Sequence, residues 1–422
     1  MRRLFAFLAA LGAIACARAQ EQETMAELRD RVFDVAKVQA VYMDSLLSDL
    51  SFRAEPQVEP LSFRATPQAE SRNLYPRTYQ DGQLVTSDIG WWCSGFYPGV
   101  LWEIYDHGHG KDKDIREMAV RRTRPLKALL DRDTDHDIGF QLMSSYGHWE
   151  CFKKEGLESP EEIAEIDRVL QTGAQKLAAR YTPKIGAIRS WNGDRWNYPV
   201  IIDNMMNLEL LMEYGDEIVA EKHALTTLKN HFRPDGTTWH LVDYADDGSV
   251  LGKQTVQGFS NDSAWARGQA WALYGYAMMG FWSMASADLY TETARNLARW
   301  IIDNLPEDGI PYWDFSRTDY KDASAAAIIA AGLLRLVEVL DVVYDEPLDP
   351  DNPLLRTAER ILRTLASPEY LAEPRTNGGF LLKHGVGNLP GGTEVDVPLS
   401  YADYYFLEAL NWYPLEVSNG SD

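Results

Sequence analysis

The pattern of hydrophobic and polar positions in this chain is mainly helical. From residue 24 onward, apolar residues recur at intervals of three and four, which places them on one face of a helix. Loops rich in Gly, Pro and Asp separate the periodic stretches. The predicted helices span residues 24–50, 91–106, 112–130, 140–155, 159–180, 201–214, 216–232, 262–281, 286–304, 321–343, 352–368 and 398–414.

The helices are of two kinds. The segments IIDNMMNLELL, AWALYGYAMMGFW and SAAAIIAAGLLRL are apolar nearly all round, which predicts helices buried on every side. The segment IREMAVRRTRPLKALL is apolar on one face, which predicts an outer helix. Twelve helices of both kinds, without runs of parallel strands, predict an all-α fold, an (α/α)6 barrel of six helical hairpins. We expect residues 20–422 to form this single domain.

Signals for strands are few. The best is TTWHLVDYADDGSVLGKQTV, two short alternating runs on either side of Asp247-Gly248, which predicts a β-hairpin. A local repeat, SFRAEPQVE followed by SFRATPQAE, has a period of 11 residues and is too short for a solenoid. We expect residues 51–70 to be an exposed insertion.

The first 19 residues have the pattern of a secretory signal peptide. Arg2 and Arg3 precede an apolar stretch that ends in Ala17-Arg18-Ala19, an A-x-A cleavage site. The apolar stretch is too short to span a bilayer, and we expect no later segment to be apolar enough to do so. We therefore expect an exported protein, periplasmic or secreted. A lipoprotein anchor at Cys16 is less favoured, because the residue three positions earlier is Ala13 rather than Leu.

Charge limits the partners of this chain. The formal net charge is −22, and the predicted signal peptide contains three arginines and no acid, so its removal makes the charge more negative. Such a field repels nucleic acids and long polyanions, but a small anion can bind where an arginine meets it. Cys93 and Cys151 could form one disulfide, and the oligomeric state is not indicated.

Three polar clusters lie at the ends of apolar helices. They are Asp135-His136-Asp137 before Gly139-Phe140, then Asp203-Asn204 with the upstream Trp191, and finally Gln257, Trp265, Arg267, Gln269 and Trp271. Paired carboxylates, an arginine and several tryptophans together indicate a carbohydrate site with acid–base chemistry.

Each cluster also has a structural interpretation. Asp137 could cap the helix that follows it. Asp203 could be a buried acid paired with an arginine, and Arg267 with Gln269 could tie neighbouring helices together. A metal at His136 is disfavoured, because adjacent His and Asp residues do not form a ligand pair on one face. We therefore expect neither metal nor cofactor.

Six segments together resemble one enzyme family, glycoside hydrolase family 88, the unsaturated glucuronyl hydrolases. The resemblance runs from about residue 74 to about residue 414 and keeps the family's order. The segments are HDIGF, RSWNGDRWNYPVIIDNMMNLELL, DDGSVLGKQTVQGFSNDSAWARGQAWALYGYA, DGIPYWDF, KDASAAAII and EVDVPLSYADYYFLEAL.

The resemblance implies an (α/α)6 barrel that removes an unsaturated uronic acid from the non-reducing end of a small oligosaccharide left by a polysaccharide lyase. It implies two catalytic aspartates, Asp203 as the proton donor and Asp137 as its partner. The family's substrate-binding residues correspond to His136, Trp191, His240, Gln257, Arg267 and Trp271. Arg267 is expected to meet the uronate carboxylate.

Three alternatives remain open at this stage. An unsaturated rhamnogalacturonyl hydrolase acting on pectin fragments is expected to have the same barrel. A non-catalytic sugar-binding toroid would keep the tryptophans but would not need both aspartates. A prenyl-diphosphate enzyme would need Asp-rich metal motifs, and DRDTDHD lacks the DDxxD arrangement. The loop FLLKHGVGNLPGGTEVD has Lys383 and His384 but lacks the serines of family members that accept sulfated sugars.

Overall fold

All twelve predicted segments are helical in the computed structural model, which describes residues 23–54, 74–153, 156 and 158–415. Six of them form an inner ring. This ring contains η1 (Trp92–Gly95) with α3 (Phe96–His107), α5 (Ile138–Leu142) with η3 (Met143–Gly147) and α6 (His148–Lys153), η4 (Ile202–Asn207) with α8 (Leu208–Tyr214), α10 (Ala266–Trp282), α12 (Ala323–Val342) and α14 (Ser400–Trp412).

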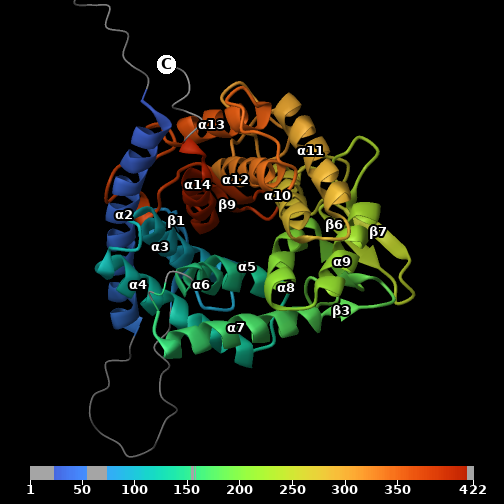
Figure 1. Ribbon diagram of the computed structural model, residues 1–422, viewed down its shortest axis with the longest axis horizontal. Helices are drawn as coiled ribbons and strands as arrows, with labels where there is room; N and C mark the ends of the chain where they lie inside the picture. The colour runs from blue at the N-terminus through green and yellow to red at the C-terminus, as the bar shows by residue number, and fades with distance from the viewer. Residues whose placement is uncertain (1–22, 55–73, 154–155, 157, 416–422) are drawn as a thin grey trace, which may run out of the picture.

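The other six helices surround this ring (Figure 1). They are α2 (Met25–Ala54), α4 (Lys113–Thr123) with η2 (Arg124–Asp131), α7 (Pro160–Ala178), α9 (Glu217–His231), α11 (Ala287–Asn304) and α13 (Pro353–Leu365). Neighbouring inner helices are in contact all the way round, and α14 returns to α3 and closes the ring. The predicted (α/α)6 barrel is confirmed.

Burial follows the two predicted kinds of helix. Nearly every residue of α10 and α12 is buried, whereas α4 buries only one face. Gly275 and Gly332 allow the inner helices to approach closely: a Cβ at Gly275 would lie 2.5 Å from Met205 Cβ, and one at Gly332 would lie 3.2 Å from Tyr274. Small residues at these crossings explain the tight packing of the ring.

Helix α12 departs from one expectation. Its length and mean hydropathy of 1.9 would allow it to span a membrane, so the prediction that no later segment is apolar enough was wrong. However, 94% of this helix is buried inside the molecule, which is the behaviour of a central core helix. A helix surrounded by protein on all sides has the same composition as one surrounded by lipid.

Four small antiparallel sheets lie between the helices. They are β1 (Tyr75–Gln80) with β2 (Gln83–Ser87), β3 (Tyr181–Thr182) with β4 (Ala187–Ile188), β5 (Pro199–Ile201) with β6 (Leu241–Tyr244) and β7 (Val250–Gln254), and β8 (Gly385–Asn388) with β9 (Thr393–Val397). The predicted hairpin is confirmed as β6–β7, and its turn contains Gly248 with a φ of +88°. Strand β5 adds to this hairpin and leads directly into η4.

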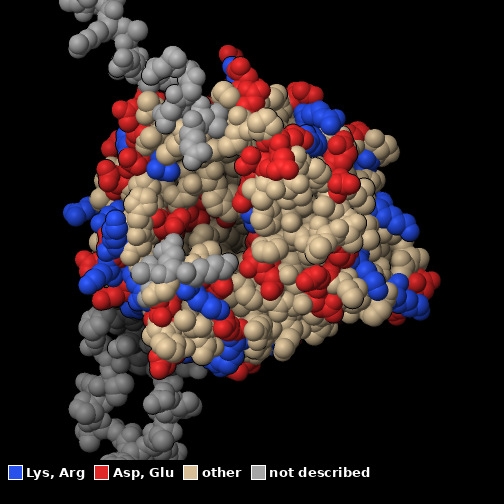
Figure 2. Space-filling model, viewed as in Figure 1, with Lys and Arg blue, Asp and Glu red and all other residues tan. Residues whose placement is uncertain are grey.

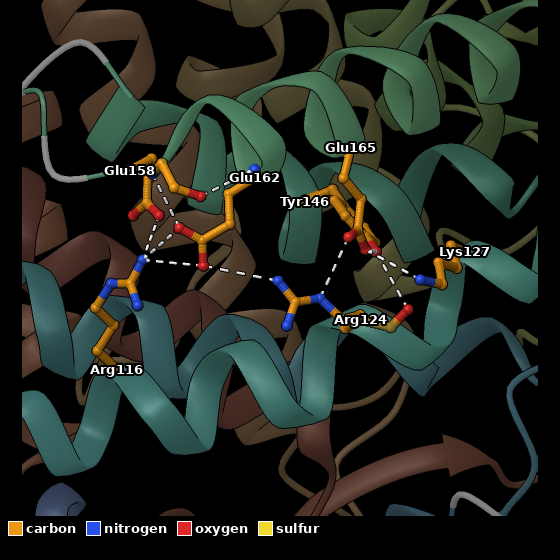
Figure 3. A network of polar contacts seen from close by, with 8 residues as sticks. Arg116, Arg124, Lys127, Tyr146, Glu158, Glu162 and Glu165 are labelled. Atoms are coloured by element: carbon orange, nitrogen blue, oxygen red, sulfur yellow. Dashed lines mark hydrogen bonds and ion pairs between the residues drawn. The ribbon is translucent and has the colours of Figure 1, made fainter.

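A polar network fastens two outer elements to each other (Figure 3). Arg116 of α4 pairs with Glu158 and Glu162 at the start of α7, and Arg124 of η2 lies 3.6 Å from Glu162 and 3.3 Å from Glu165. Single exposed ion pairs contribute little to stability. Here several ion pairs share partners, and one of these partners, Glu158, is buried. Together they fix how α4 and α7 lie against each other.

Other predictions concern the termini, the insertion and the cysteines. The signal peptide and the Cys16 alternative lie outside the described residues. So does most of the predicted insertion, although residues 51–54 continue the backbone of α2. Cys93 is buried, Cys151 is exposed, and no disulfide joins these two residues.

Candidate active site

The candidate catalytic residues lie where inner helices begin. Asp137 directly precedes α5, Asp203 lies in the first turn of η4, and Arg267 lies in the first turn of α10. The inner helices alternate with outer ones, so they all run in one direction and begin at one end of the barrel. Helix N-termini have a partial positive charge, which favours an anionic ligand at this end.

Asp203 has an apolar environment and keeps little contact with water. Its side chain is 14% exposed, and Oδ2 accepts no hydrogen bond of ordinary geometry from the described residues. Burial raises the pKa of Asp203 to about 7, against the opposing effect of the Arg267 guanidinium. No arginine forms an ion pair with it among the described side chains, so the interpretation of Asp203 as a paired structural acid is not supported. A carboxyl group in this state holds a proton near neutral pH.

The carboxyl group of Asp137 also makes no structural hydrogen bond to the helix that it precedes. It occupies the N-cap position of α5, but its side chain makes no capping hydrogen bond. Burial raises its pKa well above the usual range, and the nearby carboxylates of Asp135 and Asp203 raise it further. Because the side chain is 17% exposed and does not cap the helix, Asp137 is available for chemistry beside Asp203.

Gly139 brings the two aspartate segments together. A Cβ at this position would lie 2.4 Å from Asn207 Oδ1 and 2.6 Å from Asn207 Cα. The backbone N–H of Phe140 donates to the same Oδ1 at 2.7 Å. The start of α5 therefore lies directly against η4, and glycine is required for this approach. Asn207 has a positioning role that the sequence analysis did not identify, although its place one helical turn after Asn204 in an apolar run was a signal.

We expect Gly139→Ala to lower activity and stability together. The added methyl group would have to displace the backbone of η4, and overpacking of this kind costs about 1–3 kcal/mol. Thermal unfolding and kcat/KM measured on one preparation check this. Gly147→Ala in η3 is a milder control, because its Cβ would meet only the flexible Met143 side chain at 3.2 Å. Equal behaviour of the two variants would contradict the expectation.

His136 and Trp191 lie beside the aspartates. His136 Nε2 is 3.4 Å from Asp137 Oδ1, and burial lowers the pKa of His136 to about 3, so the imidazole is neutral. The His136 backbone N–H donates to the carbonyl of Ser190, and the Ser190 N–H donates to Pro199. These bonds hold Trp191 near the site, with its ring 6.2 Å from the His136 ring and 5.7 Å from that of Trp196.

His240 approaches Asp203 from the β5–β6 pair. Its Nε2 lies 3.7 Å from Asp203 Oδ2, and neither ring nitrogen has a hydrogen-bond partner in the described part of the chain. Burial, with a contribution from Arg267, lowers the pKa of His240 to about 3. The N–H of Ile202 donates to the His240 carbonyl at 2.8 Å, which fixes this position. Gln257 follows β7 and is half-buried.

Arg267 is buried and its donors are engaged. Its guanidinium donates to the carbonyls of Val386 and Gly387 in β8, both at 2.6 Å, and lies 3.5 Å from Asp322. It also lies over the ring of Trp265 at 4.5 Å. These contacts match the interpretation of Arg267 as a tie between neighbouring elements. Contact with a substrate carboxylate stays a prediction.

Gln269 and Trp271 are packed below the surface of the site. Gln269 Oε1 accepts from the backbone of Thr238 at 2.9 Å, so it ties α10 to the segment before β6. Trp271 is fully buried against Phe140 and Tyr405, with its ring 5.1 Å from that of Phe140. A stacking face for sugar is therefore available at the partly exposed Trp191 and not at Trp271.

Comparison with known proteins identifies the family. No family model matches the chain. The unsaturated glucuronyl hydrolase of Formosa agariphila is 40% identical over 335 residues, which cover 76% of this chain and 79% of the relative. The chain belongs to the unsaturated glucuronyl hydrolases. The corresponding enzyme of Bacillus sp. strain GL1 is 33% identical, over 77% of this chain and 87% of its own.

Solved structures of the family agree with the fold. A heparin-specific unsaturated glucuronyl hydrolase has a TM-score of 0.74 and 37% identity, and covers 91% of this chain and 97% of its own. The Bacillus sp. GL1 enzyme has a TM-score of 0.73 and 28% identity, over 90% and 96%. The chain is therefore a glycoside hydrolase of family 88, which releases an unsaturated uronic acid from lyase-generated oligosaccharides. The resemblance found in the sequence is confirmed, and a non-catalytic sugar-binding toroid is excluded.

Proposed function

We propose that Asp203 protonates C4 of the unsaturated uronic acid and thereby starts hydration of its C4=C5 bond. The observation that supports this is a carboxyl group with a pKa of about 7 and an oxygen that accepts no hydrogen bond of ordinary geometry from the described residues. A general acid works best when its pKa is near the working pH. Asp137, whose pKa is also raised, is the partner carboxyl group.

The proposed reaction uses only the substrate, one water molecule and the proton of Asp203. The proton of Asp203 goes to C4, and a water oxygen bonds to C5 while that water returns a proton to the Asp203 carboxylate. The hemiketal at C5 then opens to a ketone, and the hemiacetal left at C1 releases the aglycone as an alcohol. Neutral His240, 3.7 Å from Asp203, lies where it can orient this water.

We expect kcat/KM to fall as the pH rises above about 7. The donor is the protonated form of Asp203, so activity is present below its pKa of about 7 and is lost above it. The loss should be about tenfold per pH unit on the alkaline side. A pH profile of kcat/KM checks this, because that ratio reports the ionisation of the free enzyme. A profile that is flat from pH 6 to 9 would contradict the assignment.

For the substrate we propose an unsaturated disaccharide in which sulfate is not required. Lys383 Nζ donates to the carbonyl of Pro368, and the His384 imidazole lies 2.6 Å from Asp396. Both of these side chains are therefore already engaged with the protein. Unsaturated disaccharides from chondroitin, hyaluronan, heparin and ulvan digests, followed by loss of double-bond absorbance, test this. Turnover of sulfated sugars alone would overturn it, and preferred turnover of pectin fragments would favour the rhamnogalacturonyl alternative.

Export remains part of the proposal. The Arg2-Arg3 start, the short apolar stretch and the Ala17-Arg18-Ala19 site support cleavage before Gln20. N-terminal sequencing of the protein recovered from the periplasm or medium tests it. A mature protein that begins at a lipidated Cys16 would support the lipoprotein alternative instead.

A further inference from the structure

A cavity lined by many acidic residues lies at the end of the barrel opposite the aspartates. It has a volume of about 450 Å³ and is lined by residues from the C-terminal parts of the inner helices. Its acidic residues are Glu103, Asp106, Glu150, Glu209, Glu213, Glu338 and Glu408. Figure 2 shows a hollow near the centre of the face, with acidic side chains around it. Helix C-termini have a partial negative charge, so this end of the barrel favours a cation.

Three side chains in this cavity have the arrangement of a ligand set. Atoms of Glu103, His148 and Glu408 all lie within 4.8 Å of one another. In tetrahedral geometry, bonds of about 2.0–2.2 Å to zinc place two ligand atoms about 3.4 Å apart, so the three side chains would draw together by up to about 1.4 Å on binding. Within the described ranges, no other His, Cys, Asp and Glu group has this spacing.

Burial distinguishes this cluster from an ordinary acidic surface. Glu103 and Glu408 are 1% and 3% exposed, and Glu103 Oε1 accepts no hydrogen bond of ordinary geometry from the described residues. The partner nearest to this oxygen is His148 Nε2 at 3.2 Å. A buried carboxylate needs a proton or a cation.

The nearby arginine is already engaged elsewhere. Arg335 lies 2.8 Å from Glu209 and 2.7 Å from Glu338. Glu408 instead accepts hydrogen bonds from the hydroxyls of Tyr404 and Tyr274, at 2.9 and 3.0 Å. The two glutamates of the cluster therefore have no cation bound directly to them in the described part of the chain.

We propose that Glu103, His148 and Glu408 bind one divalent transition-metal ion of the Zn²⁺ or Mn²⁺ kind. Two carboxyl groups with one imidazole are a ligand set that such an ion accepts, and water in the cavity completes its coordination. The hydroxyl of Tyr404, 2.8 Å from His148 Nε2, gives up that hydrogen bond on binding and keeps its bond to Glu408. This site is separate from the catalytic aspartates.

The position of the cluster gives the ion a structural role. Glu103 lies on α3 of the first hairpin, and Glu408 lies on α14 of the last hairpin, where the ring closes. A bound ion would join residues about 300 positions apart in the chain. A cross-link that closes a long loop stabilises the folded state more than one that closes a short loop, because it removes more conformational freedom from the unfolded chain.

The test compares metal content with thermal stability. The purified full-length enzyme is stripped with a chelator, dialysed and titrated with Zn²⁺ or Mn²⁺ while its Tm is recorded. We expect one ion per chain and a rise in Tm of about 3 °C at one hundred times Kd. Glu103→Gln and His148→Gln should each abolish the rise, and Glu213→Gln, in the same cavity, should keep it. Turnover by the stripped enzyme should be unchanged.

Other outcomes overturn the proposal. A Tm that does not respond to either ion shows that the two glutamates share protons instead. A response that persists in both Gln variants places the ion elsewhere. Because the readouts are ion content and Tm, neither result depends on whether Asp203 is the proton donor.

Discussion

Asp203→Asn is expected to lower kcat by about 100-fold or more while the protein stays folded and binds substrate. The amide has nearly the same shape as the carboxyl group but cannot donate its proton to C4. General acid catalysis typically contributes about 10²–10⁴-fold to a rate. Turnover followed by double-bond absorbance gives kcat, and titration with an unsaturated disaccharide gives the binding constant.

Asp403→Asn is the matched control for this variant. Burial raises the pKa of Asp403 to about 7 as well, but its two oxygens accept the N–H groups of Leu381 and Leu382. Asp403 therefore resembles Asp203 in burial and in pKa, but neither of its oxygens is free to contact a substrate. We expect Asp403→Asn to affect stability and to leave kcat of the folded enzyme nearly unchanged. Near-normal turnover by Asp203→Asn would contradict the assignment of Asp203 as the proton donor.

Arg267→Ala is expected to have the largest effect on stability. Its removal takes these donors from the carbonyls of Val386 and Gly387 and leaves the buried Asp322 carboxylate without its cationic partner. Breaking a buried ion pair from one side costs about 3–5 kcal/mol. Arg267→Lys should recover only part of this, because an ammonium group cannot reach both carbonyls and the carboxylate as a planar fork does. Chemical denaturation of the three proteins measures the differences.

The same variants test the predicted contact between Arg267 and the uronate carboxylate. If this contact forms, KM rises in Arg267→Lys beyond any effect of stability, since a charge-assisted hydrogen bond contributes about 1.5–3 kcal/mol. Arg335→Ala is the control, because Arg335 is a buried arginine that pairs with Glu209 and Glu338 at the other end of the barrel. It should lower stability and leave KM unchanged. If KM changes in neither variant, Arg267 is part of the scaffold alone.

The sequence by itself determined the class of fold. Apolar residues all round α10 and α12 and on one face of α4 separated inner from outer helices, because burial imposes different periodicities on each. The β6–β7 hairpin followed from Asp247-Gly248, since a positive φ at that turn favours glycine. The family followed from six sequence motifs that occur in the family's order. The same motifs identified Asp137 and Asp203 as the pair of carboxyl groups.

Only the tertiary structure decided what each polar side chain contacts. Asp137 has the sequence signature of a helix cap, yet its carboxyl group makes no capping bond. Arg267 has the sequence signature of an anion site, yet its guanidinium donates to backbone carbonyls of β8. Strand β8 lies more than 100 residues later in the chain. The cluster of Glu103, His148 and Glu408 was not foreseen, because it forms where the last hairpin meets the first. Periodicity reports the face on which a residue lies, whereas hydrogen-bond partners and pKa depend on which distant segments pack against that face.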